Sequence, residues 1–491
     1  MHQPIIRWAS LALLCTFSPL ALYSQPTISA EEAQADFEVF KDILQTAHPS
    51  LYSYTPPHTL DSLYQAFEQD YFQDSLPVRE FFSHLSHLAD FVRDGHLTIH
   101  HPEMDPVPPL FPVFVKIIGG RFFTDSDELG IPLGSEILFI SGVSSKLILQ
   151  DLLKYASTDG YAYTKKYRQI EREFGIMHLY AYGSSSEYQV EYLTPEGLRK
   201  TTGVQPQSME AIGQRFLHRS SHFAAYHQNP NTAEHFISRV VQPKPFVYYV
   251  DSLEAAVLTV NSFGVDPREF KSTLVDLFKE LKKERVRHLV VDIRRNPGGY
   301  RANAITLYSF LTQEPFTQRT RESAITDALP QPAHVFHTMS DYADFFAMYF
   351  GAAQKEDGRW ILEKDRAEAE MIPAKKPFKG QVYVLIGGTT FSAATAFALN
   401  AKNDPRITLI GEETGGGYYF HTGQYPVMYQ LPHSGVLMRM SLVRIEKFVR
   451  DTSVPQGSGV LPDEVVRLSV DDLRLGRDAV LHRALLRISE Q

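Results

Sequence analysis

The chain has 491 residues and a formal net charge of −9, and its charged residues are spread along its length without a basic stripe. This pattern argues against nucleic acid as a partner, because binding to a phosphate backbone requires clustered lysine and arginine. The length predicts roughly two to four domains, at about 100 to 200 residues per domain.

The first two dozen residues are typical of a secretory signal peptide. Arg7 precedes an apolar run that Pro19 interrupts, and the run is shorter than the ~20 residues that a membrane-spanning helix needs. We expect cleavage near Ser24–Gln25, which would remove residues 1–24 as the signal peptide and leave no membrane span. The loss of Arg7 would leave 47 basic and 57 acidic residues, a net charge of −10.

The only cysteine, Cys15, lies inside this segment, so the mature chain would contain no disulfide. Leu14 stands where a bacterial lipoprotein signal would usually have a small residue, which argues against lipidation. An exported protein without disulfides must be stabilised by burial alone, and a chain of this size can achieve that. These features favour the periplasm or cell surface of a bacterium.

Residues 29–105 are predicted to form a small N-terminal helical domain. Ser29 is a helix-capping residue with Glu32 three positions later, and the apolar residues that follow lie on one helical face. Pro56–Pro57 interrupts this pattern, and a second helical pair follows through the sequence VREFFSHLSHLADFV.

Residues 110–203 change to short β-rich runs. The stretch IPLGSEILFISGV predicts a turn, a strand and a glycine turn, and SKLILQDLLKYAS predicts the helix after them. This order is similar to that of a PDZ-like domain, with matches at Gly134, Ile137, Ile140 and Gly142. Such a domain would bind a chain end by adding it as a strand to a sheet edge. A β-rich spacer explains the pattern equally well.

Between residues 245 and 485 strands and helices alternate, with the strands AAVLTVNSF, HLVVDI, QVYVLI and ITLIG. This alternation predicts an α/β domain with a mainly parallel sheet covered by helices. Residues 313–379 interrupt the pattern with a more polar insertion that contains the aromatic run DYADFFAMYF. The insertion would either cover a cleft or extend over the surface.

The strand HLVVDI ends in a polar glycine turn, within the sequence VVDIRRNPGGY. Ligand sites in parallel sheets lie where strands end, and glycines let backbone amides approach a ligand without a Cβ in the way. Gly298 and Gly299 are therefore candidate amide donors. The alternative is a tight structural connection in which Asp292 and Arg294 pair for stability.

A second loop, within VYVLIGGTTFSAATAF, places Ser392 at the start of a predicted helix. Free amides and the dipole at a helix N-terminus favour negative charge. If Ser392 attacked a carbonyl group, the Ala393 amide and the glycine turn could stabilise the oxyanion. The alternative is that Ser392 is an ordinary helix cap, although Thr389 or Thr390 could cap the helix equally well.

The two loops, their order and the closing sequence GSGVLPDEVV resemble the C-terminal-processing and tricorn-type serine peptidase family, over residues 96–466. The resemblance implies a crotonase-like α/β catalytic domain with Ser392 as the nucleophile. It also implies an oxyanion hole formed by Gly298, Gly299 and the Ala393 amide. The substrate would be a peptide or an unstructured protein tail.

The general base distinguishes two branches of this family. The Ser–Lys branch has a lysine where this chain has Gly417 and usually an acidic residue where it has Thr395, so a Ser–Lys pair is not expected. The tricorn-like branch uses a histidine before the PDZ-like part, and His96 in VRDGHLTIHH stands in a similar setting. An imidazole near its usual pKa is a suitable base for a hydroxyl group.

Two positions depart from the tricorn-like pattern. Gly95 stands where that branch has a serine that helps to hold the ring, and Gln456 stands where it tends to have glutamate. A glutamine can orient an imidazole, but it would stabilise imidazolium less than a carboxylate does. His421, on the loop after the nucleophile helix, is the rival base. The histidines crowded around His96 lack a recognisable zinc-ligand spacing, so no metal site is predicted.

We therefore predict an exported serine peptidase, either an endopeptidase or a tail-specific enzyme, that works through an acyl-enzyme and needs no cofactor. Its catalytic residues are expected to be Ser392, His96 and Gln456, with the His96 ring within hydrogen-bonding range of the Ser392 hydroxyl. The alternative is a catalytically silent protein that binds a peptide or another ligand on the same scaffold. A hydrolase of esters or small amides would use the same residues.

Overall fold

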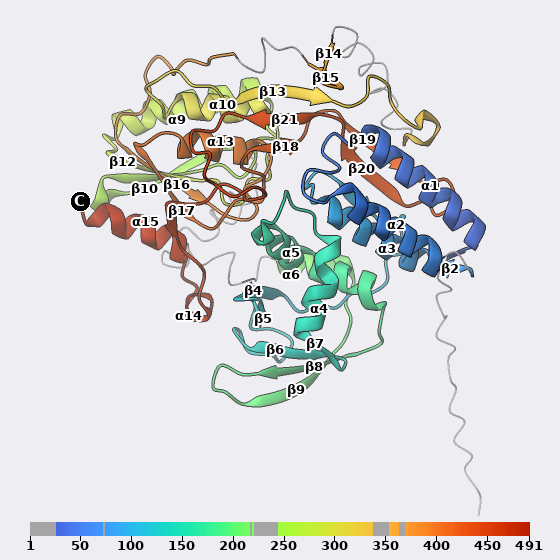
Figure 1. The fold of residues 1–491 in the computed structure, drawn as a ribbon. Helices are drawn as coiled ribbons and strands as arrows, with labels where there is room; N and C mark the ends of the chain where they lie inside the picture. Colours follow the sequence, from blue (N-terminus) through green and yellow to red (C-terminus); the bar gives the residue numbers. More distant parts are fainter. Residues whose placement is uncertain (1–25, 72–73, 217–218, 220–243, 337–352, 363–368) are drawn as a thin grey trace, which may run out of the picture.

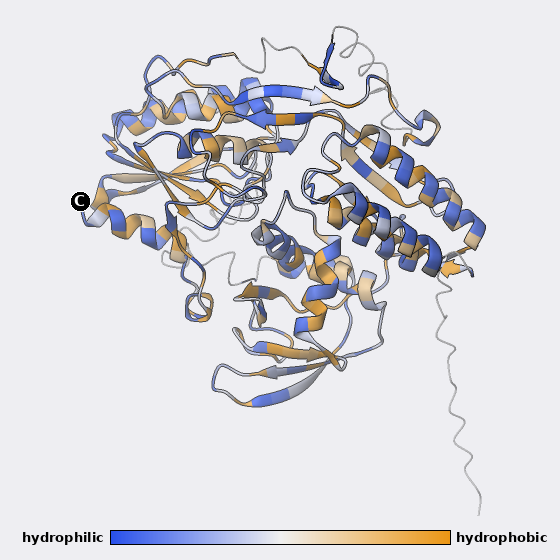
Figure 2. Ribbon diagram, viewed as in Figure 1, coloured by the Kyte–Doolittle hydropathy of each residue, from blue (hydrophilic) through white to orange (hydrophobic). Residues whose placement is uncertain are grey.

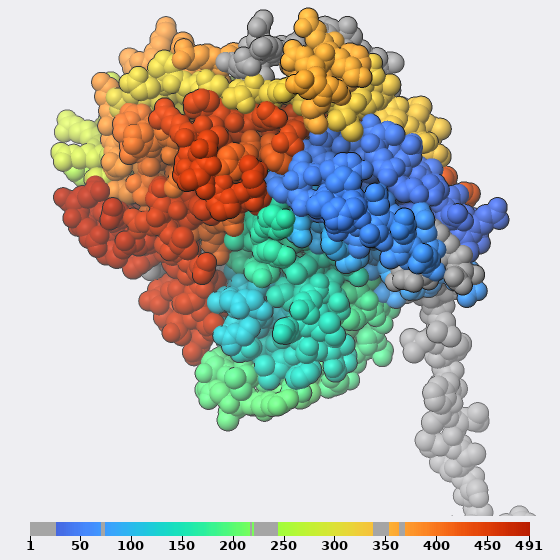
Figure 3. Space-filling view, viewed as in Figure 1, coloured from blue at the N-terminus to red at the C-terminus, as the bar shows by residue number. Residues whose placement is uncertain are grey.

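The computed structural model describes residues 26–71, 74–216, 219, 244–336, 353–362 and 369–491. The predicted signal peptide and the aromatic run of the insertion lie outside these residues. The fold is mixed α/β, and Figure 3 shows the N-terminal helices, the middle of the chain and the C-terminal half packed against one another. None of the described helices is both long and apolar enough to cross a membrane.

A six-stranded sheet forms the centre of the C-terminal half (Figure 1). The first pair of strands is antiparallel and every other pair is parallel, which confirms the predicted mainly parallel sheet. Its strands, in order across the sheet, are β10 (Phe246–Val250), β11 (Ala255–Thr259), β12 (His288–Asp292), β16 (Gln381–Ile386), β17 (Ile407–Gly411) and β22 (Glu464–Val465).

Helices cover both faces of this sheet, which explains why its central strands are almost continuously apolar (Figure 2). One face packs against α9 (Pro267–Lys283), α10 (Arg301–Ser309) and α13 (Ala393–Lys402). The other face packs against α15 (Ala479–Ser489), which follows the short α14 (Val470–Arg474). Successive residues of β11 alternate between the two cores, as the period of a strand requires.

The N-terminal helices are α1 (Ala30–Ala47), α2 (Pro57–Tyr71) and α3 (Val78–Val92). Ser29 and Glu32 form the predicted capping box of α1, and the apolar face of that helix is fully buried. The core beneath these helices is shared with a hairpin from the C-terminal half, β19 (Pro426–Gln430) and β20 (Leu437–Ser441). Strand β3 (Thr98–His100) pairs with β20, so the helices do not have a core of their own.

The middle unit, which we define as residues 110–204, is an antiparallel sheet covered by α4 (Ser145–Leu152) and α5 (Tyr163–Tyr182). A 3₁₀ turn at Leu153–Tyr155 follows α4, and residues 156–162 form a loop that reaches the C-terminal half. A short helix, α6 (Met209–Arg215), follows the unit. The strands are β4 (Val115–Ile118), β5 (Arg121–Thr124), β6 (Glu136–Ile140), β7 (Val143–Ser144), β8 (Tyr188–Leu193) and β9 (Arg199–Val204).

A further five-stranded sheet contains three strands from the predicted insertion. Two of its strands come from the segment after β17 and carry residues that face the site described below. A two-stranded sheet at the N-terminus pairs β1 (Thr27–Ile28) with β2 (Leu76–Pro77). The five strands, in order, are β14 (Gln354–Glu356), β15 (Arg359–Ile361), β13 (Arg319–Ala324), β21 (Arg444–Lys447) and β18 (Phe420–Thr422).

Candidate active site

Ser392 has a strained backbone and does not act as a helix cap. It immediately precedes α13 with φ +54° and ψ −121°, a conformation that residues other than glycine rarely adopt. Its side chain makes no capping hydrogen bond to the helix. The hydroxyl is therefore available for another partner, and the ordinary-cap alternative does not describe this serine.

Buried hydrogen bonds join the serine loop to the glycine turn that was predicted to lie beside it. The hydroxyl of Thr390 donates to the carbonyl oxygen of Ile293 (3.0 Å), and the amide of Phe391 donates to the carbonyl oxygen of Asn296 (3.1 Å). The amide side chain of Asn296 donates to the carbonyl oxygen of Val260 (3.0 Å). These bonds fix the ends of β12 and β16 relative to each other.

The glycine turn lies directly against Ser392. A Cβ on Gly298, whose φ is +104°, would lie 2.7 Å from the Ser392 Cβ, so only glycine permits this approach. The Gly298 amide donates to Oδ1 of Asn296 (2.9 Å) and is therefore already engaged. Within the described residues, the amides of Gly299 and Ala393 donate to no protein acceptor. Two of the three predicted oxyanion donors are thus free.

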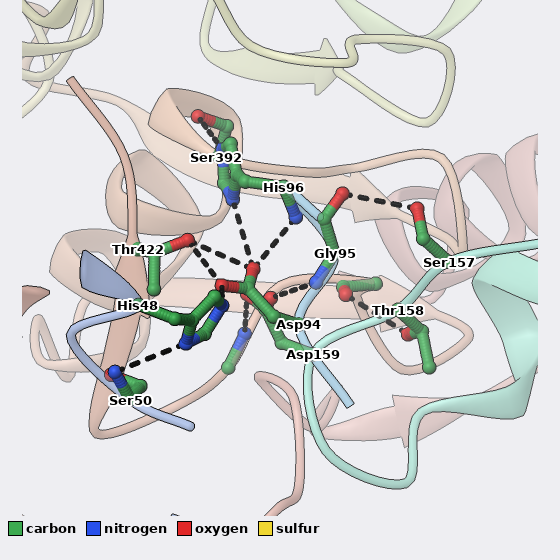
Figure 4. A network of polar contacts seen from close by, with 12 residues as sticks. His48, Ser50, Asp94, Gly95, His96, Ser157, Thr158, Asp159, Ser392 and Thr422 are labelled. Carbon is green, nitrogen blue, oxygen red and sulfur yellow. Dashed lines mark hydrogen bonds and ion pairs between the residues drawn. The ribbon is translucent and has the colours of Figure 1, made fainter. Parts of the chain in front are cut away.

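His96 is the histidine that reaches the serine. Its Nε2 lies 3.1 Å from Ser392 Oγ (Figure 4). Its ring packs against Phe391 at a centroid distance of 4.5 Å. The rival base, His421 on β18, is buried and stacks against His96 with the ring centroids 5.6 Å apart. The hydrogen bond to Ser392 thus comes from His96.

The predicted orienting contact from Gln456 is absent. Gln456 is exposed, and across the described part of the chain it makes no hydrogen bond to His96. The buried Nδ1 of His96 has no hydrogen-bond partner among the described residues, but Asp94 Oδ1 lies 3.9 Å from it. The same oxygen accepts the His96 backbone amide (2.7 Å). The group beside Nδ1 is therefore a carboxylate two residues earlier in the chain.

Two distant segments of the chain contact the Asp94 carboxylate, as Figure 4 shows. The hydroxyl of Thr422 donates to it at 2.6 Å from Oδ2, and Nε2 of His48 lies 2.9 Å from the same oxygen. The amide of Ser50 donates to Nδ1 of His48 (3.3 Å), which places the proton of a neutral His48 on Nε2, facing the carboxylate. Sequence reasoning missed both His48 and Thr422.

The pKa values of these groups set their charge. Burial opposes ionisation of Asp94, but the hydrogen bond and charge of His48, together with His96 and Thr422, lower the pKa of Asp94 to about 2. Burial lowers the pKa of His96 to about 4, against the opposing effect of the Asp94 charge. At neutral pH a neutral imidazole therefore lies beside an ionised carboxylate.

Phe391 explains the departure at Gly95. A Cβ on Gly95 would lie 2.6 Å from two ring atoms of Phe391 and 3.0 Å from Oδ1 of Asp159. The serine expected from the tricorn-like pattern could not fit there without displacing the ring that packs on His96. In this chain the aromatic ring occupies the space of that side chain.

Asp292 and Arg294 have the structural role that was considered for them. The guanidinium of Arg294 donates to Asp292 and to Asp478, at 2.6 Å each. Burial alone would lower the pKa of Arg294, but the charges of these two carboxylates raise it well above its usual value. Asp478 also caps α15 by accepting the amide of Leu481 (3.0 Å). This pair therefore attaches α15 to the end of β12.

One group of side chains has the residue types of a metal site. Ligand atoms of Asp94, His96 and Asp159 all lie within 4.8 Å of one another. Both carboxylates, however, already accept hydrogen bonds: Asp94 from Thr422, and Asp159 from two backbone amides. This arrangement suits two carboxyl groups held by hydrogen-bond donors better than a cation site.

A strained serine, an imidazole within hydrogen-bonding distance and two free amides beside them define a serine-type hydrolase. Residues 254–466 match the family described as peptidase family S41. The chain thus contains a peptidase family S41 domain over these residues, which supports a serine-type peptidase.

The fold extends the likeness over nearly the whole chain. It is similar to mature CPAF complexed with lactacystin, with a TM-score of 0.63 and 14% identity over 94% of this chain and 98% of that one. Mature CPAF in a further crystal structure gives a TM-score of 0.60 and 13% identity over 93% and 97%. A comparison with curated protein sequences found no match.

Proposed function

We propose that the protein hydrolyses peptide bonds through an acyl-enzyme, with Ser392 as the nucleophile and His96 as the general base. The 3.1 Å approach of His96 Nε2 to Ser392 Oγ carries this proposal. Nε2 accepts the hydroxyl proton as Oγ attacks the substrate carbonyl carbon, and the imidazolium then protonates the leaving amine. A water molecule, activated by the same nitrogen, hydrolyses the ester and restores the serine.

The free amides of Gly299 and Ala393 are the donors for the oxyanion in this mechanism. Both belong to rigid connections, one at the glycine turn and one at the first residue of α13, so they need no reorganisation as charge develops. The dipole of α13 adds to the Ala393 contribution. The Gly298 amide supports the turn by binding Asn296.

Asp94 takes the role that was expected of Gln456. Its lowered pKa keeps it ionised at the pH where His96 works, and it faces the nitrogen that carries a proton when Nε2 accepts one. The 3.9 Å separation is long for a hydrogen bond, and catalytic hydrogen bonds commonly shorten once substrate is bound. Asp94 thus stabilises the imidazolium by charge, which a glutamine could not do.

We also propose a substrate class and a location. The substrate is a peptide or an unstructured protein tail that enters as an extended chain, bound in part by a PDZ-like middle unit next to a crotonase-like catalytic domain. The signal-like first 24 residues and a remainder without cysteine support export to a bacterial periplasm or cell surface. Cell fractionation followed by N-terminal sequencing of the protein tests the location.

An active-site serine probe followed by mass spectrometry tests the chemistry. We expect covalent labelling at Ser392 in the wild type and its loss in Ser392→Ala and His96→Ala. His178→Ala is the matched control, because His178 is also a buried histidine with a pKa lowered by burial, but it lies in the core of the middle unit. An unlabelled wild-type serine together with a tightly bound peptide would instead identify a silent binding protein.

A further inference from the structure

We propose that Asp159, in the loop 156–162 of the middle unit, is a positioning residue that holds the His96 loop against the nucleophile domain. This inference rests on the proposed function, because it concerns the base of that reaction. Asp159 touches neither Ser392 nor the site of the reacting carbonyl, and it acts through backbone amides.

The side chain of Asp159 joins two segments that flank the catalytic pair. Its Oδ1 accepts the amide of Gly95 (2.7 Å), the residue directly before His96 (Figure 4). Its Oδ2 accepts the amide of Gly417 (2.9 Å), in the loop between β17 and β18. Each oxygen therefore holds a different element, and the distance between the two elements is set by one carboxylate group.

Gly417 is also held through its carbonyl group. The buried Nζ of Lys447, on β21, donates to the Gly417 carbonyl oxygen. The two peptide units that flank the Cα atom of Gly417 are thus both held, one at its N–H by the carboxyl group of Asp159 and the other at its C=O by the side chain of Lys447. This support makes Gly417 a firm anchor, so Asp159 connects the His96 loop to a part of the molecule that does not move easily.

Backbone hydrogen bonds also connect the loop 156–162 to two other segments. The amide of Gly160 donates to the carbonyl oxygen of Arg93 (2.9 Å), and the amide of Tyr161 donates to that of Gly457 (2.8 Å). Arg93 is the C-terminal cap of α3 and precedes Asp94. The loop therefore contacts the His96 loop at its start, through Arg93, and at its centre, through Gly95.

Packing alone does not fix this region. A cavity of about 450 Å³ lies between α3, β3 and the segment from the 3₁₀ turn to α5, and Asp94, Ser157 and Thr158 are part of its lining. One side of the His96 loop therefore faces a hollow instead of a packed core. Where packing is incomplete, directional hydrogen bonds decide the position of a loop, and Asp159 accepts one of them from Gly95.

Asp36 offers a matched control elsewhere in the molecule. It is also a buried aspartate whose two oxygens accept two backbone amides, those of His433 (3.0 Å) and Ser434 (2.7 Å). It joins α1 to the turn between β19 and β20. An asparagine at either position keeps the shape but can accept only one of the two amides and faces the other with its own N–H groups.

The experiment compares Asp159→Asn with Asp36→Asn in the full-length protein, by thermal unfolding, by peptidase kinetics and by the rate of probe labelling at Ser392. We expect both variants to lower the melting temperature, and only Asp159→Asn to lower kcat, by about tenfold or more with KM little changed. The labelling rate of Ser392 should fall by a similar factor. A role in stability alone would not separate kcat from KM in this way.

Several results would overturn the inference. One is a kcat within twofold of the wild type in folded Asp159→Asn, and another is an equal loss of kcat in both variants. If Asp159→Asn does not fold, Asp159→Ser and Asp36→Ser are measured instead, and failure of Asp159→Ser to fold would show a role in stability alone. The proposed function fails separately, when the wild-type serine is not labelled.

Discussion

The loops that carry Ser392 and His96 meet in one hydrogen bond, but they are built in different ways. The Ser392 loop is fixed within a single domain, by bonds between the ends of neighbouring parallel strands. The His96 loop depends on groups from the N-terminal helices, the middle unit and β18. The backbone hydrogen bonds that hold the Ser392 loop thus come from one domain, whereas those that hold the His96 loop come from several parts of the chain.

Asp94→Asn should have the largest effect of the changes that test this comparison. It keeps the size of the side chain but removes the charge that stabilises the imidazolium, so we expect kcat to fall by about a hundredfold or more. The measurement is steady-state kinetics with a peptide substrate at pH 7. A kcat within a fewfold of the wild type would show that the charge at Asp94 is not used.

The pH profile should reveal the burial of His96. Because its pKa is lowered to about 4, the imidazole stays neutral and active as a base well below the usual histidine range. We expect kcat/KM to fall tenfold per pH unit only below about pH 4, wherever the protein remains folded. In the unfolded chain, His96 takes up a proton near its ordinary pKa of 6.5, whereas in the folded protein it does so only near 4. The stability that neutral His96 contributes is therefore present above about pH 6.5 and is lost as the pH falls from 6.5 toward 4. An acid limb centred near pH 6.5 would contradict the buried position.

Gly95→Ala tests the fit between the two loops. The added Cβ would lie 2.6 Å from the Phe391 ring, so we expect a loss of about 1–3 kcal/mol in the free energy of unfolding and a several-fold lower kcat as the ring shifts against His96. Gly213→Ala in α6 is the control, because a Cβ there meets no atom within 4 Å. Denaturant unfolding and kinetics measure the two effects. Equal stability of the two variants would mean that Phe391 yields without cost.

Gln456→Ala should have the smallest effect. Gln456 is exposed and makes no contact with His96, so we expect kcat/KM to change by less than about twofold, as for an ordinary surface position. Steady-state kinetics with the peptide substrate provides the measurement. A loss comparable to that in Asp94→Asn would restore Gln456 to the orienting role.

The sequence predicted the features that depend on local pattern. The parallel strands follow from their apolar runs, α1 follows from Ser29 and Glu32, and Ser392 follows from its place between a strand and a helix. His96 was identified by resemblance, and the structure brings it to Ser392. Its partners could not be found in this way, because His48 and Thr422 belong to distant segments and neither stands in a motif.

The two weak points of the prediction have physical explanations. Gln456 was chosen by its place in a motif, and the turn that carries it points into solvent instead of toward the ring. Gly95 was taken as a departure from the family pattern, but the neighbouring Phe391 leaves no space for a side chain there. Both depend on the packing of side chains between loops, which the sequence of either loop does not contain.

The core shared by the N-terminal helices and the hairpin β19–β20 has a consequence for synthesis. Helices α1 to α3 leave the ribosome early, but their apolar faces find their partner only after residue 441 has emerged. Strand β3, next to the base, must also wait for β20. His96 and Ser392 are therefore brought together only after most of the chain has been made.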